Sequence, residues 1–545
     1  MRRPTLRAAE ALLDVLASSG SPVMFGLPGS TDAPVLDAFV SRRGLHYVLG
    51  LHESAVVAMA DGYARGTGRP ALANLHTTVG TGNALTGLFN AFKDRSPVVA
   101  LATHKHSAIL GRDGFCVGPD LAAWAAPVTK WAWQGVRAEQ ICDDAARALK
   151  VAGTAPRGPV FLCYPEDLLG EEVGDSRPHA GHEPLADASP SAQQIAAIEN
   201  MWSGAARPVL IAGDEVSSTG AVEVLLRVAE RHGTPILQED RRSAVTWNVP
   251  ADHPLYAGMY SPQHPVVAAS DLVIGLGCRL AVEFSPGREP AVPGNAALIH
   301  VHRDPWEVGK LYAVSLGVVA STRLVLEALW ESCKQHPAKS PRQVPRPAGR
   351  AATPPAGGED HDGPVSPTGL AQPLASVAPP ETVIVDEAVR SSRALLEHYP
   401  CRPGQYFHSS GGGLGWGLPA ALGIQMAMPG RPVVAYVGDG SLMFAVQALW
   451  TAVREQLPVK VIVCNNKKYL AVKAGLLEYG SEAVARGVYP GVSLAAPDMD
   501  FVALAGSFGI PGRKISGPLA LGDALRWAFK VDGPVLVDVP ITDQI

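Results

Sequence analysis

Short apolar runs alternate with longer stretches of helical periodicity through the first 170 residues of the chain. The runs are short enough, and rich enough in apolar residues, to be buried strands. They are Val23–Phe25, His46–Gly50, Ala71–Leu75, Val98–Ala102 and Val160–Tyr164. Because helical stretches separate the runs, the pattern predicts a parallel sheet wrapped by helices.

The same alternation recurs twice later in the chain. In residues 193–335 the apolar runs are Val209–Ala212, Ile236–Gln238, Leu272–Leu276 and Leu298–Val301. From residue 368 onward they are Val383–Val385, Val433–Val437, Val459–Cys464 and Val535–Asp538. The fold class is therefore predicted to be α/β, with three doubly wound parallel-sheet domains.

Two stretches between these regions lack the alternation. Residues 171–192 are polar and contain proline, and residues 336–367 combine proline, glycine and charge in a composition that cannot bury a core. The predicted organisation is a first domain at 1–170, a central domain at 193–335, a Pro-rich linker at 336–367 and a last domain at 368–545.

Charge and cysteine usage narrow the class of protein. The 545 residues have a formal net charge of −5 and no extended basic stripe, which argues against nucleic-acid binding. No apolar run reaches the roughly 18 residues of a membrane span. The seven cysteines are scattered without a CxxC pair, which is typical of reduced thiols in a cytoplasmic protein. The basic and then apolar N-terminus resembles a signal peptide, but Leu12 and Leu16 fit a helical stripe interrupted by Asp14, so we expect a first helix.

The segment Val433–Asn466 reads as one strand–helix–strand unit with candidate metal chemistry. Its first strand ends at Gly438-Asp439-Gly440-Ser441, and its second ends at Asn466. Carboxyl ends of parallel strands meet at one edge, so Asp439 and Asn466 should face the same space. Two oxygen donors and a nearby backbone carbonyl suit Mg²⁺ carrying a diphosphate, and a helix N-terminus favours the anion. The alternative is an ordinary turn with a capping aspartate.

Three polar residues of the first domain also lie at predicted strand ends. They are Ser30 in a glycine-rich turn, Glu53 at a helix start and His76 at a loop-to-helix entry. Their common position points to one crevice. The alternatives are a Glu53 that only satisfies a helix dipole and a His76 that is an ordinary core or loop histidine.

Together these motifs resemble those of thiamine-diphosphate-dependent 2-keto acid decarboxylases and acetolactate synthases, most of all the benzoylformate decarboxylase branch. The resemblance runs through nearly the whole chain, in the motifs FGLPGS, LHESAVVAMADGYAR, NLHTTVGTGNA, GGLGWGLPAALG, GDGS and NN. It implies a pyrimidine-binding first domain, a middle domain and a diphosphate-binding last domain. The implied cofactors are thiamine diphosphate and Mg²⁺.

The resemblance also assigns roles to individual residues. Glu53 matches the glutamate that hydrogen-bonds the aminopyrimidine ring and favours its imino tautomer, which activates the thiazolium carbon. Leu414 matches the apolar residue that holds the cofactor bent. Ser30 and His76 match residues that contact the substrate carboxylate and move protons. The implied metal ligands are Asp439, Asn466 and the carbonyl of Lys468, and further cofactor contacts are Gly412, Gly438, Gly440 and Ser441.

The implied reaction cleaves the bond between the carboxylate and C2 of a 2-oxo acid. Release of an aldehyde is the leading hypothesis, and transfer of the acyl group to a second carbonyl compound, as in acetolactate synthase, is the alternative. A second catalytic histidine of the decarboxylase branch aligns with Val282, so that proton-transfer role is missing or moved. A catalytically silent homologue with a regulatory or structural role is a third hypothesis. The joint presence of Glu53, Leu414, Asp439 and Asn466 argues against it, because a scaffold has no need for Glu53.

The substrate space is less well defined by sequence. Its candidate residues are His104, His106, Leu110, Val282, Ala471 and Val472. Additional positive charge lies near it at Lys105 and in the segment 467–473. These side chains either face solvent or recognise a second anionic group on the substrate.

Assembly and flavin binding are predicted from the same resemblance. A homodimer or homotetramer is expected, with the first domain of one subunit meeting the last domain of another at each active site. FAD, which some relatives bind in the middle domain, is not expected. Residues 193–335 contain no GxGxxG after a strand, and the loop Ala257–Pro262 departs from the expected flavin-binding pattern.

Overall fold

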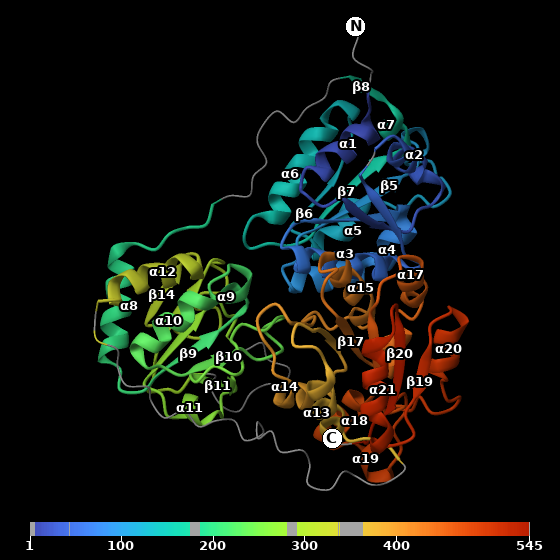
Figure 1. The fold of residues 1–545 in the computed structure, drawn as a ribbon. Coiled ribbons are helices and arrows are strands. Elements are labelled where there is room, and N and C mark those ends of the chain that lie inside the picture. The colour runs from blue at the N-terminus through green and yellow to red at the C-terminus, as the bar shows by residue number, and fades with distance from the viewer. Residues whose placement is uncertain are drawn as a thin grey trace. The chain divides into compact units, whose positions relative to one another are not determined.

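The computed structural model describes residues 6–42, 44–174, 186–280, 292–335, 337 and 363–543. The chain divides into two compact units (Figure 1). The first unit comprises Met1–Leu185, Pro355–Leu395 and Gly411–Ile545, and the second comprises Ala186–Pro354 and Leu396–Ser410. The first unit contains one complete six-stranded sheet and all but one edge strand of a second, and the second unit contains the third six-stranded sheet. The predicted α/β class with three parallel-sheet domains is confirmed.

The first sheet has the strand order β3-β2-β4-β5-β7-β6, and all of its pairs are parallel. Its strands are β2 (Val23–Gly26), β3 (His46–Leu49), β4 (Ala71–His76), β5 (Val98–His104), β6 (Trp131–Gln134) and β7 (Val160–Pro165). Strand alternation explains how both faces are covered. Met24 packs in a core with α1 (Ala8–Ala17) and α6 (Ile141–Gly153). The next residue, Phe25, meets Tyr63 of α3 (Glu53–Thr67) edge-on at 5.8 Å between ring centroids.

The other elements of this domain are short apart from α4 (Thr77–Lys93). They are η1 (Ser30–Asp32), α2 (Ala33–Ser41), η2 (Ser107–Ile109), α5 (Leu121–Ala125), η3 (Ala126–Val128), η4 (Ala138–Gln140) and α7 (Glu166–Gly170). Strand β1 (Leu6–Arg7) pairs antiparallel with β8 (Glu172–Gly174). The predicted first helix is present as α1, with Leu12 and Leu16 fully buried.

The last sheet has the order β16-β15-β17-β18-β20-β19. Its strands are β15 (Val383–Glu387), β16 (Tyr406–Phe407), β17 (Val433–Gly438), β18 (Lys460–Asn465), β19 (Gly512–Lys514) and β20 (Val535–Pro540). Its helices are α13 (Pro367–Val377), α14 (Ser392–His398), α15 (Gly417–Ala427), α16 (Asp439–Met443), α17 (Ala448–Arg454), α18 (Leu470–Tyr479), α19 (Glu482–Arg486), α20 (Phe501–Ser507) and α21 (Pro518–Lys530).

Helices α3 and α15 bring the two sheets of the first unit together (Figure 1). A Cβ atom on Gly62 would lie 2.2 Å from the carbonyl oxygen of Ala420, and one on Gly423 would lie 2.0 Å from that of Met59. The helices therefore pack with their backbones in contact, which only glycine allows at these positions. The indole N–H of Trp416 donates to Asp61 at 2.6 Å beside this contact.

The second unit contains a parallel sheet of order β11-β10-β9-β12-β13-β14. Its strands are β9 (Pro208–Ala212), β10 (Ile236–Gln238), β11 (Tyr256–Met259), β12 (Leu272–Leu276), β13 (Ala297–His302) and β14 (Leu316–Val319). Its helices are α8 (Ala192–Gly204), α9 (Asp214–Ser218), α10 (Val222–His232), α11 (Pro265–Ala268) and α12 (Thr322–Cys333).

Each sheet has one point at which successive strands turn to opposite sides. This switch point lies between β2 and β4, between β9 and β12, and between β15 and β17. Ligands of open parallel sheets bind beyond the carboxyl ends of the strands at such points. The side chains at the three switch points are therefore the candidates for ligand binding.

Two global predictions concern cysteines and membranes. All seven cysteines are free thiols, and all except the partly exposed Cys116 are buried. Among the described residues, no helix has the length and apolar character needed to cross a bilayer. Most of the predicted 336–367 linker falls outside the described residues, and the domain boundaries stay predictions.

Candidate active site

The three polar residues predicted in the first domain lie around its switch point. Ser30 begins η1 directly beyond β2 and is exposed to solvent, and His76 ends β4 with a side chain that is 22% exposed. A Cβ atom on Gly29 would overlap the His76 imidazole at 1.9 Å, so the glycine-rich turn is what allows the ring to sit against it. Ser30 is therefore the neighbour in sequence of the glycine that packs against His76, and the crevice predicted to hold Ser30, Glu53 and His76 stays a prediction.

A buried aspartate orients His76, and sequence reasoning missed it. Asp32 is fully buried, and its Oδ2 lies 3.5 Å from Nδ1 of His76. The same carboxylate accepts hydrogen bonds from the Gly29 N–H at 2.8 Å and from Nδ2 of Asn74 at 3.0 Å. Burial and the charge of Asp32 raise the pKa of Tyr47, whose hydroxyl donates to Asn74. Thr31 Oγ1 approaches the same Nδ1 at 3.4 Å, so Nδ1 faces Thr31 and Asp32, and Nε2 is the His76 atom left for a substrate.

Glu53 is the first residue of α3 and is 4% exposed. Its Oε2 accepts a hydrogen bond from Nδ2 of Asn83 on α4 at 3.0 Å. A Cβ atom on Gly80 would lie 2.8 Å from Oε1, so this glycine lets α4 approach the carboxylate closely. A carboxylate that only served the helix dipole would have no need of such burial.

The same face of α4 also holds the glycine loop before α15. Asn90 lies two turns after Asn83; its Nδ2 donates to the Gly413 carbonyl at 2.8 Å, and its Oδ1 accepts from the Gly413 N–H at 3.0 Å. Gly412 has a φ of +80° with nothing within 4 Å of its Cβ position, and the half-buried Leu414 follows it. One helix of the first domain therefore connects Glu53 to the loop carrying Leu414 within a single chain.

Glu387 is a second residue that sequence reasoning missed. It ends β15, beside the last sheet's switch point, and its carboxylate accepts hydrogen bonds from the Trp416 and Gly417 N–H groups, both at 3.0 Å. Burial raises the pKa of Glu387 to about 7, against the opposing effect of these N–H groups. It fixes the start of α15, and no motif in the sequence singles it out.

Asp439 and Asn466 follow neighbouring parallel strands, since β17 and β18 pair with Gly438 opposite Cys464. The Asp439 carboxylate accepts from the N–H groups of Gly440 at 2.8 Å and Lys467 at 2.6 Å. The Asn466 carboxamide oxygen accepts from the Lys468 N–H at 3.0 Å. The loop reaches this shape through a positive φ of 56° at Lys467. The predicted ligand set therefore lies on two adjacent loops.

This end of the last sheet fits a metal-bound diphosphate. Burial raises the pKa of Asp439, and among the described residues no basic side chain forms an ion pair with it. A divalent cation would relieve that buried negative charge. A Cβ atom on Gly438 would meet nothing nearer than 3.7 Å, so the strand end is open to a phosphate, and Ser441 is buried one turn further on.

The predicted substrate residues differ from one another in burial and in hydrogen-bond partners. His104 ends β5; burial lowers its pKa, and its Nδ1 accepts from the Lys105 N–H. His106 is exposed, with Nδ1 3.7 Å from Asp167. Leu110 is half-buried, whereas Ala471 and Val472 are exposed on α18. Val282 lies outside the described residues.

The basic residues after Asn466 have partners. The ammonium of Lys467 lies 2.6 Å from Asp498, and Lys468 pairs with Asp543. Lys473 lies over the Tyr489 ring at 5.2 Å. These pairings favour a structural role for the positive charge over recognition of a second anionic group.

Comparison with known families and proteins agrees with this layout. Residues 6–123 match the family described as thiamine pyrophosphate enzyme, N-terminal TPP binding domain, residues 195–329 match its central domain, and residues 388–539 match its C-terminal TPP binding domain. The chain is 31% identical over 540 residues to a benzoylformate decarboxylase of Pseudomonas aeruginosa, which covers 97% of this chain and 98% of that protein. It is 27% identical over 554 residues to the acetolactate synthase isozyme 1 large subunit of Escherichia coli, covering 99% and 94%.

Solved structures give the same result. A thiamine diphosphate-dependent 4-hydroxybenzoylformate decarboxylase of Rhodococcus jostii superposes with a TM-score of 0.85 at 28% identity, over 98% of this chain and 99% of that one. A benzoylformate decarboxylase of Polynucleobacter necessarius superposes with a TM-score of 0.89 at 25% identity, over 100% and 99%. Sequence match, domain order and fold agree, and the chain belongs to the thiamine pyrophosphate enzyme family.

Proposed function

We propose that this protein is a thiamine-diphosphate- and Mg²⁺-dependent decarboxylase that converts a 2-oxo acid to an aldehyde and CO₂. The observation that carries the proposal is the pair of buried carboxylates. Glu53 is held by Asn83 against the first domain, and Asp439 lies beside Asn466 at the last sheet's switch point. The similarity to benzoylformate decarboxylases supports the substrate class.

The cofactor, when bound, supplies a carbon nucleophile and an electron sink for the carbanion left by decarboxylation. Asp439, Asn466 and the carbonyl of Lys468 would hold Mg²⁺ and through it the diphosphate. Backbone groups of Gly438, Gly440 and Ser441 would approach the phosphates at the N-terminus of α16. Leu414 and Gly412 would lie against the cofactor from the loop that Asn90 holds.

Glu53 would exchange a proton with the aminopyrimidine nitrogen. Its burial favours this role because, in a site shielded from water, solvent does not compete for the hydrogen bond to the ring nitrogen. Asn83 fixes one of its oxygens by donating to Oε2, which leaves Oε1 for the ring.

His76 would deliver and accept protons at the reacting carbon and carboxylate. Asp32 orients the imidazole through Nδ1, so Nε2 is directed to the substrate side. Ser30, exposed one residue beyond the glycine that supports the ring, would donate a hydrogen bond to the substrate carboxylate.

Carboligation is the second candidate, because the acetolactate synthase similarity covers nearly the whole chain. It is also favoured by Val282, which aligns with a proton-donating histidine of the decarboxylase branch and cannot donate a proton. Without that donor the reactive carbon remains available to a second carbonyl compound. Val282→His is expected to raise the ratio of aldehyde to ligation product, and an unchanged ratio would remove this position from the partitioning.

The direct test incubates the purified protein with thiamine diphosphate, Mg²⁺ and a panel of 2-oxo acids, with CO₂ and product analysis. Aldehyde as the main product supports the decarboxylase, and a 2-hydroxy ketone or acetohydroxy acid supports the carboligase. No turnover of any 2-oxo acid by cofactor-loaded protein would favour the silent homologue. Absorption spectra of the same preparation test the prediction that FAD is not bound, and its mass in solution tests the predicted dimer or tetramer.

A further inference from the structure

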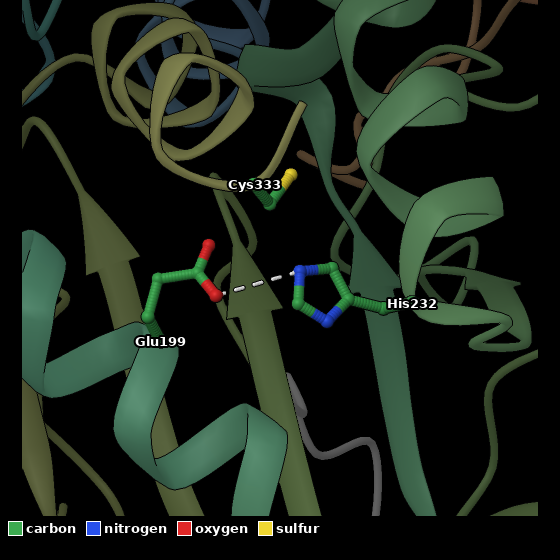
Figure 2. A group of neighbouring side chains, drawn as sticks. All are labelled: Glu199, His232 and Cys333. Atoms are coloured by element: carbon green, nitrogen blue, oxygen red, sulfur yellow. Dashed lines mark ion pairs between the residues drawn. The ribbon is translucent and has the colours of Figure 1, made fainter. Parts of the chain in front are cut away.

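Three potential metal ligands lie close together in the second unit, called the central unit below. They are far in sequence from the residues of the proposed active site. They are Glu199 on α8, His232 at the end of α10 and Cys333 at the end of α12, and Figure 2 shows the Glu199 carboxylate facing the His232 imidazole with Cys333 beside them. One ligand atom from each lies within 4.8 Å of the other two. Their residues are 9%, 5% and 0% exposed, so the group is closed off from bulk water.

Two buried polar atoms of this group lack hydrogen-bond partners. Neither Nε2 of His232 nor Oε1 of Glu199 has one, although both atoms are buried. The sulfur of Cys333 makes only a weak contact of 3.8 Å with the Trp330 carbonyl. An unsatisfied buried polar atom is destabilising, so two of them at one point call for a ligand.

The spacing also suits a shared cation better than a direct hydrogen bond. Oε2 of Glu199 and Nε2 of His232 are 3.6 Å apart, which is too long for a hydrogen bond between them. Two ligands about 2.0–2.1 Å from a tetrahedral zinc ion are separated by roughly 3.4 Å. The observed separation is close to that value.

The surroundings hold the imidazole in place. The His232 ring stacks on Trp202 at 4.2 Å between centroids and 16° between planes. The indole N–H of Trp202 in turn donates to Thr234 at 2.9 Å. Such support around a metal-binding histidine fixes the direction of its ligand atom.

We propose that Glu199, His232 and Cys333 bind a divalent transition-metal ion, Zn²⁺ by preference, at a structural site of the central unit. A sulfur, a nitrogen and an oxygen ligand suit this borderline-soft ion and do not suit Mg²⁺, which requires oxygen. Zn²⁺ with one thiolate and one carboxylate has zero net charge, which a buried position tolerates. A water molecule completes the tetrahedron, and the ion joins α8, α10 and α12.

Binding exchanges a proton for the metal without any redox change. Without a metal, a buried thiol is protonated at neutral pH. The S–H bond breaks, the S–Zn bond forms, and the proton leaves to solvent. Affinity should therefore rise with pH.

Co²⁺ serves as the spectroscopic probe of this site in the full-length protein. After treatment with a chelator, the wild type should bind one Co²⁺ with a thiolate-to-cobalt charge-transfer band that Zn²⁺ removes. The Asp439 site has only oxygen ligands and cannot produce this band, so failure of the proposed cofactor site would not affect the result. Absence of the band at saturating Co²⁺ would overturn the proposal.

Matched variants assign the ligands. Cys333→Ser should abolish the band and His232→Gln should weaken metal binding at least tenfold. Two control variants should leave the charge-transfer band and the metal affinity unchanged. They are Cys278→Ser, at another buried thiol of the same unit, and His253→Gln, at a histidine paired with Glu230 of α10. A band that persists in Cys333→Ser would contradict the site.

The wild type also gives a test that does not depend on variant folding. Zinc addition at neutral pH should release about one thiol proton per ion and raise the midpoint of thermal unfolding. Zinc binding without proton release would exclude Cys333 as a ligand.

Discussion

The switch points of the last and central sheets share an architecture but differ in what the chain places there. Gly438 ends β17 and Gly213 follows β9, so the two glycines occupy comparable positions. A Cβ atom on Gly438 would have 3.7 Å of clearance, whereas one on Gly213 would lie 2.3 Å from the Cα of Cys278. The last sheet's crevice is open, and the central one is closed by its own backbone.

The carboxylates at the two switch points differ in the same way. In the central sheet, Asp214 accepts hydrogen bonds from the backbone of Val245 and Thr246, and thereby closes a loop over the strand ends. The Asp439 carboxylate accepts hydrogen bonds from the N–H groups of its own turn and of the Lys467 loop. No cationic side chain among the described residues pairs with it. The same residue type therefore completes the fold in one sheet and leaves room for a ligand in the other.

The largest expected effect follows from Glu53→Gln. Glutamine keeps the side-chain volume and a hydrogen bond to the cofactor ring but cannot exchange a proton with it. We expect turnover to fall by about 10²–10⁴-fold with the fold retained. NMR measurement of C2-proton exchange in the bound cofactor is the test, with Glu230→Gln, whose side chain is 59% exposed in the central unit, as the control. Wild-type exchange in Glu53→Gln would remove this role.

The comparison of the two aspartates can be tested directly. Asp439→Ala should lower cofactor affinity at least tenfold and abolish its dependence on Mg²⁺, because two oxygen ligands are too few to hold the ion. Asp214→Ala should instead lower the free energy of unfolding by about 1–3 kcal/mol and leave Mg²⁺-dependent affinity unchanged. Calorimetric titration and chemical denaturation measure both quantities, and equal effects of the two substitutions would contradict the distinction.

The two glycines give a smaller and opposite pair of effects. Gly213→Ala forces a Cβ atom against the Cys278 backbone and should destabilise the protein by about 1–3 kcal/mol. Gly438→Ala has space and a φ of −74°, so stability without cofactor should change little. Its added methyl group faces the proposed diphosphate, and cofactor affinity should fall. If both substitutions shift the denaturation midpoint of the cofactor-free protein equally, the two crevices do not differ in the space they leave for a side chain.

The last prediction concerns pH and Glu387. Its pKa is raised from 4.5 to about 7 in the folded protein, so between these values the folded state binds more protons than the unfolded state. Its contribution to stability is therefore present below pH 4.5 and is lost as the pH rises toward 7. Glu387→Gln should flatten this part of the stability–pH profile, whereas Glu172→Gln at an exposed position should not. An identical slope in Glu387→Gln and wild type would refute the assignment.

Strand position in the sheet decided which strands the sequence could predict. Every interior strand of the three six-stranded sheets was predicted, because burial on both faces produces a continuous apolar run. The edge strands β6, β11, β14, β16 and β19 were missed, and only β3 was predicted among the edges. Edge strands such as β14 and β19 contain exposed residues and resemble loops in sequence.

The candidate site shows a similar limit. Glu53, His76, Asp439 and Asn466 lie in motifs at strand ends, and their neighbourhoods follow from topology. Asp32 and Glu387 act through other residues, across 44 positions from Asp32 to His76 and 29 from Glu387 to Trp416. Such pairings depend on tertiary structure, and no local spacing indicates them.

The backbone contact between α3 and α15 has a consequence for anyone recombining members of this family. There is no space for a side chain at Gly62 or at Gly423. The contact between the two halves of the first unit therefore depends on glycine at both positions. A chimera that joins residues 1–170 of this chain to the last domain of a relative must therefore inherit glycine on both sides. An alanine at either position would force the two helices apart. The hydrogen bond from the Asn90 amide to the Gly413 carbonyl would then be lost.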